Sequence, residues 1–207
     1  MYINESVQHK DLGKVWIGCM KDILEHGEHV MDDKESLLEI RNYYVTISQI
    51  DERDAILKTY ANSERIALMK EKYTSCNVLK GYKISYGKLI YDNQGVNQVE
   101  WILNKLKEKP ETKSATLTMH IPGQNELSCL SMLDFKMRNG KLDMSVVYRS
   151  QNVFASQPGN FIALSNIQKY LANELNVELG CVEAIILSAH IYDKNLTDVC
   201  NILEEFD

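Results

Sequence analysis

Two apolar segments on either side of Asn139-Gly140 constrain the fold of this chain more than any other feature. Residues 130–138 and 141–149 are rich in strand-forming side chains. Asn-Gly is strongly preferred in the two-residue turn that joins antiparallel strands. The sequence therefore predicts a β-hairpin over these residues, which excludes an all-helical fold.

Helices and strands are both predicted outside the hairpin, from apolar periodicity and from Gly and Pro stops. The predicted helices are residues 10–26, 51–73 as two short helices broken near 61–63, 96–107, 161–175 and 195–206. The further predicted strands are residues 37–50, 83–91 as a strand or extended turn, 114–121 and 182–192. Because helices and strands do not alternate regularly, an α+β fold is favoured over a doubly wound sheet.

The composition fits a single domain over residues 1–207, since no Gly/Ser-rich linker or repeat interrupts the chain. The formal net charge of −6 argues against a broad basic face, so no nucleic-acid partner is predicted. No apolar window reaches the roughly 18 residues of a membrane span, and residues 1–10 lack the apolar run of a signal peptide. The five cysteines have no metal-binding spacing, which indicates reduced thiols, a cytoplasmic location and no metal site.

The segment 148–160 is polar and rich in amides, although it follows an apolar strand and precedes an amphipathic helix. So many hydrogen-bonding side chains in one place predict a bound ligand. Two readings of Asn160 stay open, because a carboxamide can pair with the edge of a base and an Asn after Pro-Gly can cap a helix. His190 and Tyr192 lie two residues apart on a predicted strand, so they share one face, as ligand contacts or as part of the core.

Several separated motifs, in their order and spacing, resemble the thymidylate synthase family and its pyrimidine hydroxymethylase relatives. The motifs are Arg149-Ser150-x-Asn152-Val153-Phe154, Pro158-x-Asn160, Ala189-His190-Ile191-Tyr192, Ser85-Tyr86-Gly87-Lys88 and Gly95-Val96-Asn97-Gln98. The resemblance is clearest over residues 80–195. It implies one α+β domain with a mixed sheet, helices packed on one face of that sheet, and a homodimer.

The resemblance also implies a catalytic group made of Cys129, Tyr86 and Arg149. In the family a cysteine thiolate adds to C6 of a pyrimidine, and C5 then attacks a one-carbon unit carried by 5,10-methylenetetrahydrofolate. Such a thiolate needs a nearby cation, for which Arg149 is the candidate, while Tyr86 belongs to the polar network around C5. Taken alone, Cys129 is better explained as a small buried apolar residue at the start of a strand, and its spacing to Asn139-Gly140 and to Arg149 brings the two interpretations level.

The substrate contacts implied by the resemblance lie in the polar segment 148–160, in the last predicted strand and at Lys113. Arg149 and Ser150 would meet a phosphate, with Lys113 standing where the family's partner subunit lends arginines. Asn160 would read the base, His190 and Tyr192 would bind a sugar hydroxyl, and the cofactor-binding position is Asn152. The ligand is thus a pyrimidine nucleotide or nucleoside.

Some family positions have changed, so two functions are predicted. Ser128 and Leu130 flank Cys129 where the family has Pro and His, Asn152 replaces an Asp, and the family's catalytic Glu has no clear counterpart. The first function is a methyl- or hydroxymethyltransferase of nucleotide biosynthesis that acts at C5. The alternative is a catalytically inactive homologue that binds a pyrimidine nucleotide or nucleoside as a sensor or interaction module.

Overall fold

The hairpin predicted around Asn139-Gly140 is confirmed in the computed structural model. β6 (Leu130–Arg138) and β7 (Lys141–Tyr148) pair in antiparallel register. Asn139 and Gly140 have φ of 50° and 76°, the positive pair that a tight hairpin turn requires. The structure describes residues 2–3 and 10–206, so residues 1, 4–9 and 207 of the predicted domain lie outside it, and the single-domain division stays a prediction.

The hairpin is part of a mixed sheet, with nine strands among the described residues, in the order β1-β4-β9-β7-β6-β5. β9 lies between β4 and β7 and pairs with β4 in antiparallel and with β7 in parallel register. The remaining strands are β1 (Tyr2–Ile3), β2 (Lys10–Asp11), β3 (Glu28–Asp32), β4 (Glu35–Gln49), β5 (Thr116–Thr118), β8 (Gln151–Asn152) and β9 (Glu178–Tyr192). β2 and β3 pair with β4, and β8 pairs with β9. The predicted α+β class is therefore confirmed.

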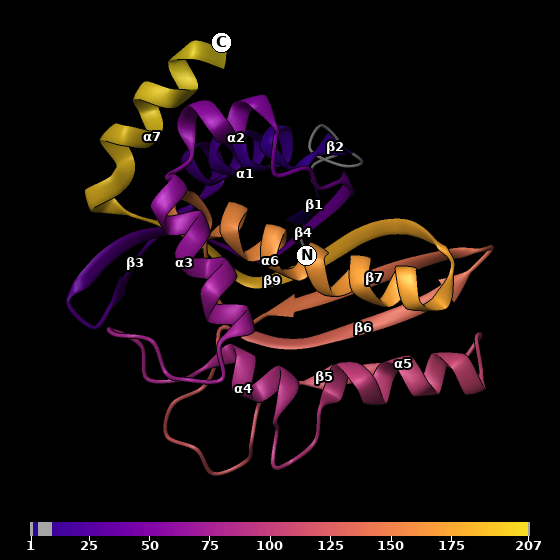
Figure 1. Cartoon of the computed structure of the whole chain (residues 1–207). Helices are drawn as coiled ribbons and strands as arrows, with labels where there is room; N and C mark the ends of the chain where they lie inside the picture. Colours follow the sequence, from indigo (N-terminus) through magenta and orange to yellow (C-terminus); the bar gives the residue numbers. More distant parts are fainter. Residues whose placement is uncertain (1, 4–9, 207) are drawn as a thin grey trace.

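The helices gather around α6, which lies over the sheet (Figure 1). They are α1 (Leu12–His26), α2 (Ala55–Tyr60), α3 (Ser63–Thr74), α4 (Tyr86–Tyr91), α5 (Gln98–Glu108), α6 (Val153–Leu175) and α7 (Leu196–Leu203), with short 3-10 turns at Asp193–Asn195 and Glu204–Phe206. Side chains along β7 alternate between buried and partly exposed, and buried Tyr148 packs against Phe161 of α6 with ring centroids 6.2 Å apart. No helix in the described part of the chain is long and apolar enough to cross a membrane.

Two elements differ from the sequence prediction. The strand or extended turn predicted at residues 83–91 is wrong, because residues 86–91 form α4. Ser85 explains the difference: its hydroxyl accepts from the Lys88 amide and donates to the Ser75 carbonyl, which caps α4 and ties it to the end of α3. In addition, β3 was not predicted, since its residues 28–32 carry little strand signal and are ordered by pairing with β4.

The helix predicted at residues 161–175 begins eight residues earlier, at Val153. Pro158-Gly159 favours a break in an isolated chain, but Gly159 instead allows α6 to approach α3 closely. A Cβ placed on Gly159 would lie 2.8 Å from Cβ of Met69 and 3.1 Å from Cα of Ile66. The polar segment is therefore largely the first part of a buried helix.

Gly159→Ala tests this close contact between α6 and α3. Alanine normally favours a helix over glycine by about 1 kcal/mol, but here its methyl group would push against α3, and we expect a net loss of about 1–3 kcal/mol. The measurement is the free energy of unfolding from urea denaturation. Asn173→Ala, at an exposed position of the same helix, is the matched control and should change stability by less than about 0.5 kcal/mol. A Gly159→Ala variant as stable as the parent protein would contradict the packing argument.

Candidate functional site

Cys129 lies immediately before β6, where two backbone hydrogen bonds fix its position. Its amide donates to the phenol oxygen of Tyr86 at 2.8 Å, and its carbonyl accepts from the Arg149 amide at 2.8 Å. Its side chain is partly buried. The thiol is therefore set at the edge of the core, at the point where β6, α4 and the end of β7 meet.

The Arg149 side chain folds back over the segment that leads to Cys129. Its Nε donates to the Ser128 carbonyl and its Nη2 to the Leu127 carbonyl, both at 3.0 Å. The same Nη2 lies 4.0 Å from the Cys129 sulfur. The structure thus brings the three residues of the predicted catalytic group together, with a permanent cation beside the thiol.

Three buried tyrosines, Tyr73, Tyr86 and Tyr148, lie next to Cys129 in the core. The hydroxyls of Tyr73 and Tyr148 share a hydrogen bond of 2.7 Å, and the rings of Tyr73 and Tyr86 meet edge to face, with centroids 5.1 Å apart. Burial raises the pKa of Tyr73 and Tyr148 well above the usual value for a phenol, and burial together with the nearby Cys129 charge raises the pKa of Tyr86. All three phenols are therefore neutral hydrogen-bonding groups at neutral pH.

Lys72, on the last turn of α3, belongs to the same cluster and was missed by the sequence analysis. Its Nζ lies 3.9 Å from the ring centroid of Tyr86 and 4.2 Å from that of Tyr82. Burial lowers the pKa of Lys72 to about 8, against an opposing effect of the Cys129 charge. The sequence signal that could have found Lys72 is its spacing from Arg65, since two turns of one helix place both cations on the same face.

Three of the predicted substrate residues lie on two neighbouring elements, α6 and β9. Asn160 is buried within α6, and His190 is buried near the end of β9. The rings of His190 and Tyr192 lie 5.1 Å apart, and burial lowers the pKa of His190, which favours the neutral imidazole at neutral pH. The helix-cap reading of Asn160 is wrong, because the residue lies eight positions inside the helix from its cap, Asn152.

Asn152 caps α6, and its side-chain oxygen accepts from the Ala155 amide at 2.9 Å. Asn152 also pairs with His190 across β8 and β9, which places it beside the predicted sugar contacts. Ser150, partly buried, joins Arg149 to this segment. Lys113 is exposed between α5 and β5. Within the described residues its side chain forms no hydrogen bond or ion pair with the group around Cys129. The roles of these residues stay predictions.

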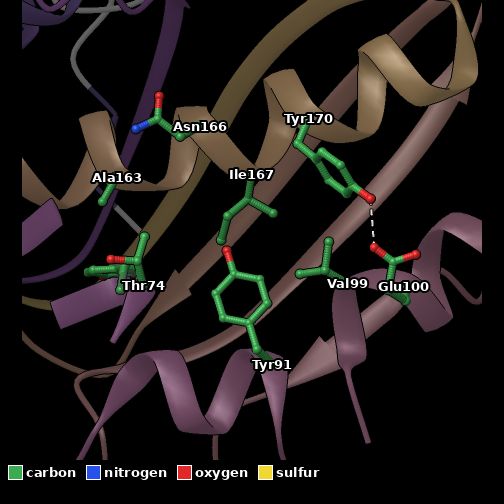
Figure 2. Close-up of a pocket in the computed structure, with 9 residues that line it drawn as sticks. Thr74, Tyr91, Val99, Glu100, Ala163, Asn166, Ile167 and Tyr170 are labelled. Atoms are coloured by element: carbon green, nitrogen blue, oxygen red, sulfur yellow. Dashed lines mark hydrogen bonds between the residues drawn. The ribbon is translucent and has the colours of Figure 1, made fainter. Parts of the chain in front are cut away.

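A separate cavity of about 230 Å³ lies between α3, α4, α5 and α6 (Figure 2). Tyr91 points its hydroxyl toward Ile167 there, and Tyr170 donates to Glu100 at 2.6 Å at one side. Tyr73 lines the cavity and also bonds Tyr148, whereas Cys129 and the other predicted site residues do not line it. Among the described residues, no group of three or more His, Cys, Asp or Glu could hold a metal ion.

This fold agrees with the comparison with known families. The statistical model of the family described as thymidylate synthase matches residues 8–205. The chain belongs to the thymidylate synthase family, as its motifs indicated, and membership supports a thymidylate-synthase-like transferase function.

The chain is also similar to curated proteins named "Putative thymidylate synthase". The one from Methanosarcina acetivorans is 29% identical over 210 residues, covering 98% of this chain and 96% of that protein. The one from Methanosarcina mazei is 28% identical over 208 residues, with the same coverage. The one from Methanocaldococcus jannaschii is 28% identical over 188 residues, covering 82% of each chain.

Tyr86→Phe tests whether the phenol oxygen fixes the Cys129 backbone. The change leaves the partly buried Cys129 amide without its acceptor, so we expect a loss of about 1–2 kcal/mol in the free energy of unfolding. Tyr91→Phe, on the same helix, is the control for loss of a phenol oxygen alone. Equal stability losses in the two variants would show that the bond to Cys129 contributes nothing specific.

Proposed function

We propose that this protein transfers a one-carbon unit to C5 of a pyrimidine nucleotide, by methylation or hydroxymethylation, through a Cys129 thiolate adduct at C6. The single observation that carries the proposal is the Arg149 guanidinium 4.0 Å from the Cys129 sulfur. A cation at this distance stabilises a thiolate against the neutral thiol. Family membership supplies the substrate class to which such a nucleophile applies.

Each step assigns a task to a residue of the group. The Cys129 sulfur forms a bond to C6 of the pyrimidine, and the electron pair of the C5–C6 double bond moves toward C5 and O4. C5 would then bond to the one-carbon unit; when the C5 proton is lost, the bond between the transferred carbon and its carrier nitrogen breaks, and the nitrogen takes the electron pair. A hydride (methylation) or water (hydroxymethylation) would add to the exocyclic carbon, and the sulfur leaves C6 with the electron pair of its own bond. Tyr86, kept neutral by burial, hydrogen-bonds in the network around these atoms without adding charge.

The proposed substrate contacts use side chains with suitable chemistry. The buried Asn160 carboxamide can donate to one position and accept from another on a uracil-type base. His190 and Tyr192 face a sugar hydroxyl, and Arg149 with Ser150 faces a phosphate, to which Lys113 of a second copy would add charge. When bound, 5,10-methylenetetrahydrofolate supplies the one-carbon unit, and Asn152, partly exposed beside His190, would contact it through its amide.

A second candidate is the inactive homologue that binds a pyrimidine nucleotide or nucleoside without transfer. It is favoured because the side chains of Arg149 and Asn152 already form hydrogen bonds within the protein. The Arg149 guanidinium is bonded to the Leu127 and Ser128 carbonyls, and the Asn152 oxygen is bonded within the cap of α6. Side chains with these partners can serve as fixed walls of a binding pocket.

We also propose a homodimer through the face of the sheet opposite α6. Between the buried positions of β4, β7 and β9, the side chains of Tyr44, Val147 and Ile185 are partly exposed, and Leu187 is 43% exposed. Tyr44 pairs with Ile185, and Ile185 with Val147, so these side chains form one apolar row across three strands. A two-fold pairing of such faces buries the row in an isologous interface.

The transfer reaction is tested by trapping the adduct with 5-fluoro-dUMP and 5,10-methylenetetrahydrofolate. Fluorine at C5 cannot leave as a proton does, so the reaction stops with the nucleotide bound to sulfur, and we expect the adduct mass on the peptide that contains Cys129. Cys129→Ser should give no adduct. Absence of an adduct in the parent protein, combined with nucleotide binding that survives in Cys129→Ser, would support the binding module instead.

The dimer is tested by measuring mass in solution by analytical ultracentrifugation at micromolar concentration. We expect a dimer for the parent protein, weakened in Ile185→Asp by about 2 kcal/mol, or about 30-fold in Kd, because a carboxylate would be buried in the row. Trp101→Asp changes an equally apolar but separate exposed position on α5 and should leave the dimer intact. A monomeric parent protein would refute the interface.

A further inference from the structure

We propose that Lys72 is the second cation that stabilises the thiolate form of Cys129, acting together with Arg149. The inference rests on the proposed function only in taking Cys129 as the nucleophile. It assigns to α3 a positioning and electrostatic role that none of the family motifs recognised in the sequence carries.

The end of α3 holds Lys72 in place beside the nucleophile. The last turn of α3 is closed by the Ser75 amide, which donates to the Glu71 carbonyl at 2.8 Å. The Ser75 carbonyl accepts from the Ser85 hydroxyl at 2.6 Å, which joins α3 to the start of α4. Tyr86 follows directly on α4, so the same junction positions the ammonium over the ring whose oxygen binds the Cys129 amide.

Among the described residues, the side chains in contact with the Lys72 ammonium are aromatic rings, without an ion-paired carboxylate. Its Nζ lies over the rings of Tyr86 and Tyr82, and within the described chain it forms no ion pair with Asp or Glu. Lys70, two residues earlier, is bonded to Glu52 at 2.8 Å. A partly buried ammonium held by aromatic faces alone is under-compensated. A thiolate at Cys129 is the anion that would balance it.

The charge of Lys72 determines the pH range in which this support acts. Since burial lowers the pKa of Lys72 to about 8 and the Cys129 charge opposes that shift, the lysine is protonated below about pH 8. Its support for the thiolate is therefore present at neutral pH and is lost as the pH rises above 8 and the proton leaves. This sign is opposite to that expected if Lys72 acted as a neutral base.

Other titratable groups around Cys129 do not supply this cation. Tyr73, Tyr86, Tyr148 and Tyr192 interact with the Cys129 charge, and burial raises the pKa of all four, so they stay neutral at neutral pH. Arg65 acts on Lys72 by repulsion, while its own Nη atoms are bonded to the Tyr82 hydroxyl and the Ser156 hydroxyl. His120 also lies close by, with its Nε2 3.2 Å from the Ser128 carbonyl and not on the thiol. Lys72 and Arg149 are thus the lysine and the arginine that lie beside the Cys129–Tyr86 pair.

The test is the rate at which iodoacetamide alkylates Cys129, measured by peptide mass spectrometry from pH 6 to pH 10. Exposed Cys200 on α7 reports the intrinsic rate in the same sample. We expect Lys72→Met to lower the Cys129 alkylation rate about tenfold at pH 7.5. A shift of one pH unit in the protonation equilibrium of a thiol changes the fraction present as thiolate about tenfold. The difference should shrink to less than about twofold at pH 10, where Lys72 of the parent protein has lost its proton. Lys72→Arg should retain most of the rate.

Lys70→Met is the matched control, because it removes a lysine of the same helix that is paired with Glu52, and its Cys129 rate should equal that of the parent protein. Urea denaturation identifies any variant that alters reactivity by unfolding. If Cys129 in a folded Lys72→Met variant reacts at the parent rate across the pH range, or if the loss is the same at every pH, the proposal is overturned. The assay contains no nucleotide or folate, so its result is independent of the adduct experiment: Lys72 can fail while transfer stands, and transfer can fail while Lys72 stands.

Discussion

The hydrogen bond from the Cys129 amide to the Tyr86 phenol oxygen is the contact on which the arrangement of the site depends. It joins the first residue before β6 to a helix that precedes it by more than forty positions in the chain. Tyr86 can make this bond only because Ser85 caps α4 and anchors it to the end of α3. One polar contact thereby fixes the distance between the sheet, which presents the cysteine, and the helices, which present Tyr86 and Lys72.

The polar segment at residues 148–160 combines two structural tasks with its proposed chemical ones. Asn152 starts α6, and Gly159 lets that helix lie against α3. A helix so closely packed is a rigid support, which suits Asn160 because an amide that reads a base must be held in one orientation. Because the same segment has structural and proposed chemical roles, substitutions in it are difficult to interpret. Loss of the cap or of the close contact lowers the stability of the protein even without a ligand.

Local signals in the sequence were sufficient where one side-chain pattern decides one element. Asn139-Gly140 specified its hairpin, and the apolar spacing of residues 96–107 specified a helix. Contacts with other segments decided two further elements. The Ser85–Ser75 hydrogen bond stabilises a helix at residues 86–91, and pairing with β4 orders residues 28–32 as a strand. The resemblance located Cys129, Tyr86 and Arg149, which the structure brings together, but it contained no motif for α3. The spacing of Lys72 from Arg65 places both cations on one face of a helix, but the contact between the Lys72 ammonium and the ring of Tyr86 is a feature of the structure alone.

The pairing of β4 with β9 has a consequence for how the chain reaches this structure. Residues 37–47 pair with residues 182–192, so the centre of the sheet joins segments that are at least 135 residues apart in the sequence (182 − 47). Contacts between such distant segments carry a large loop-closure cost and make folding slow. A ribosome that has released only the first 177 residues has supplied α6 and the hairpin but not the strand between β4 and β7. Until β9 has been synthesised, an apolar hairpin and an apolar helix therefore lack their central partner, which exposes this stage of biogenesis to aggregation.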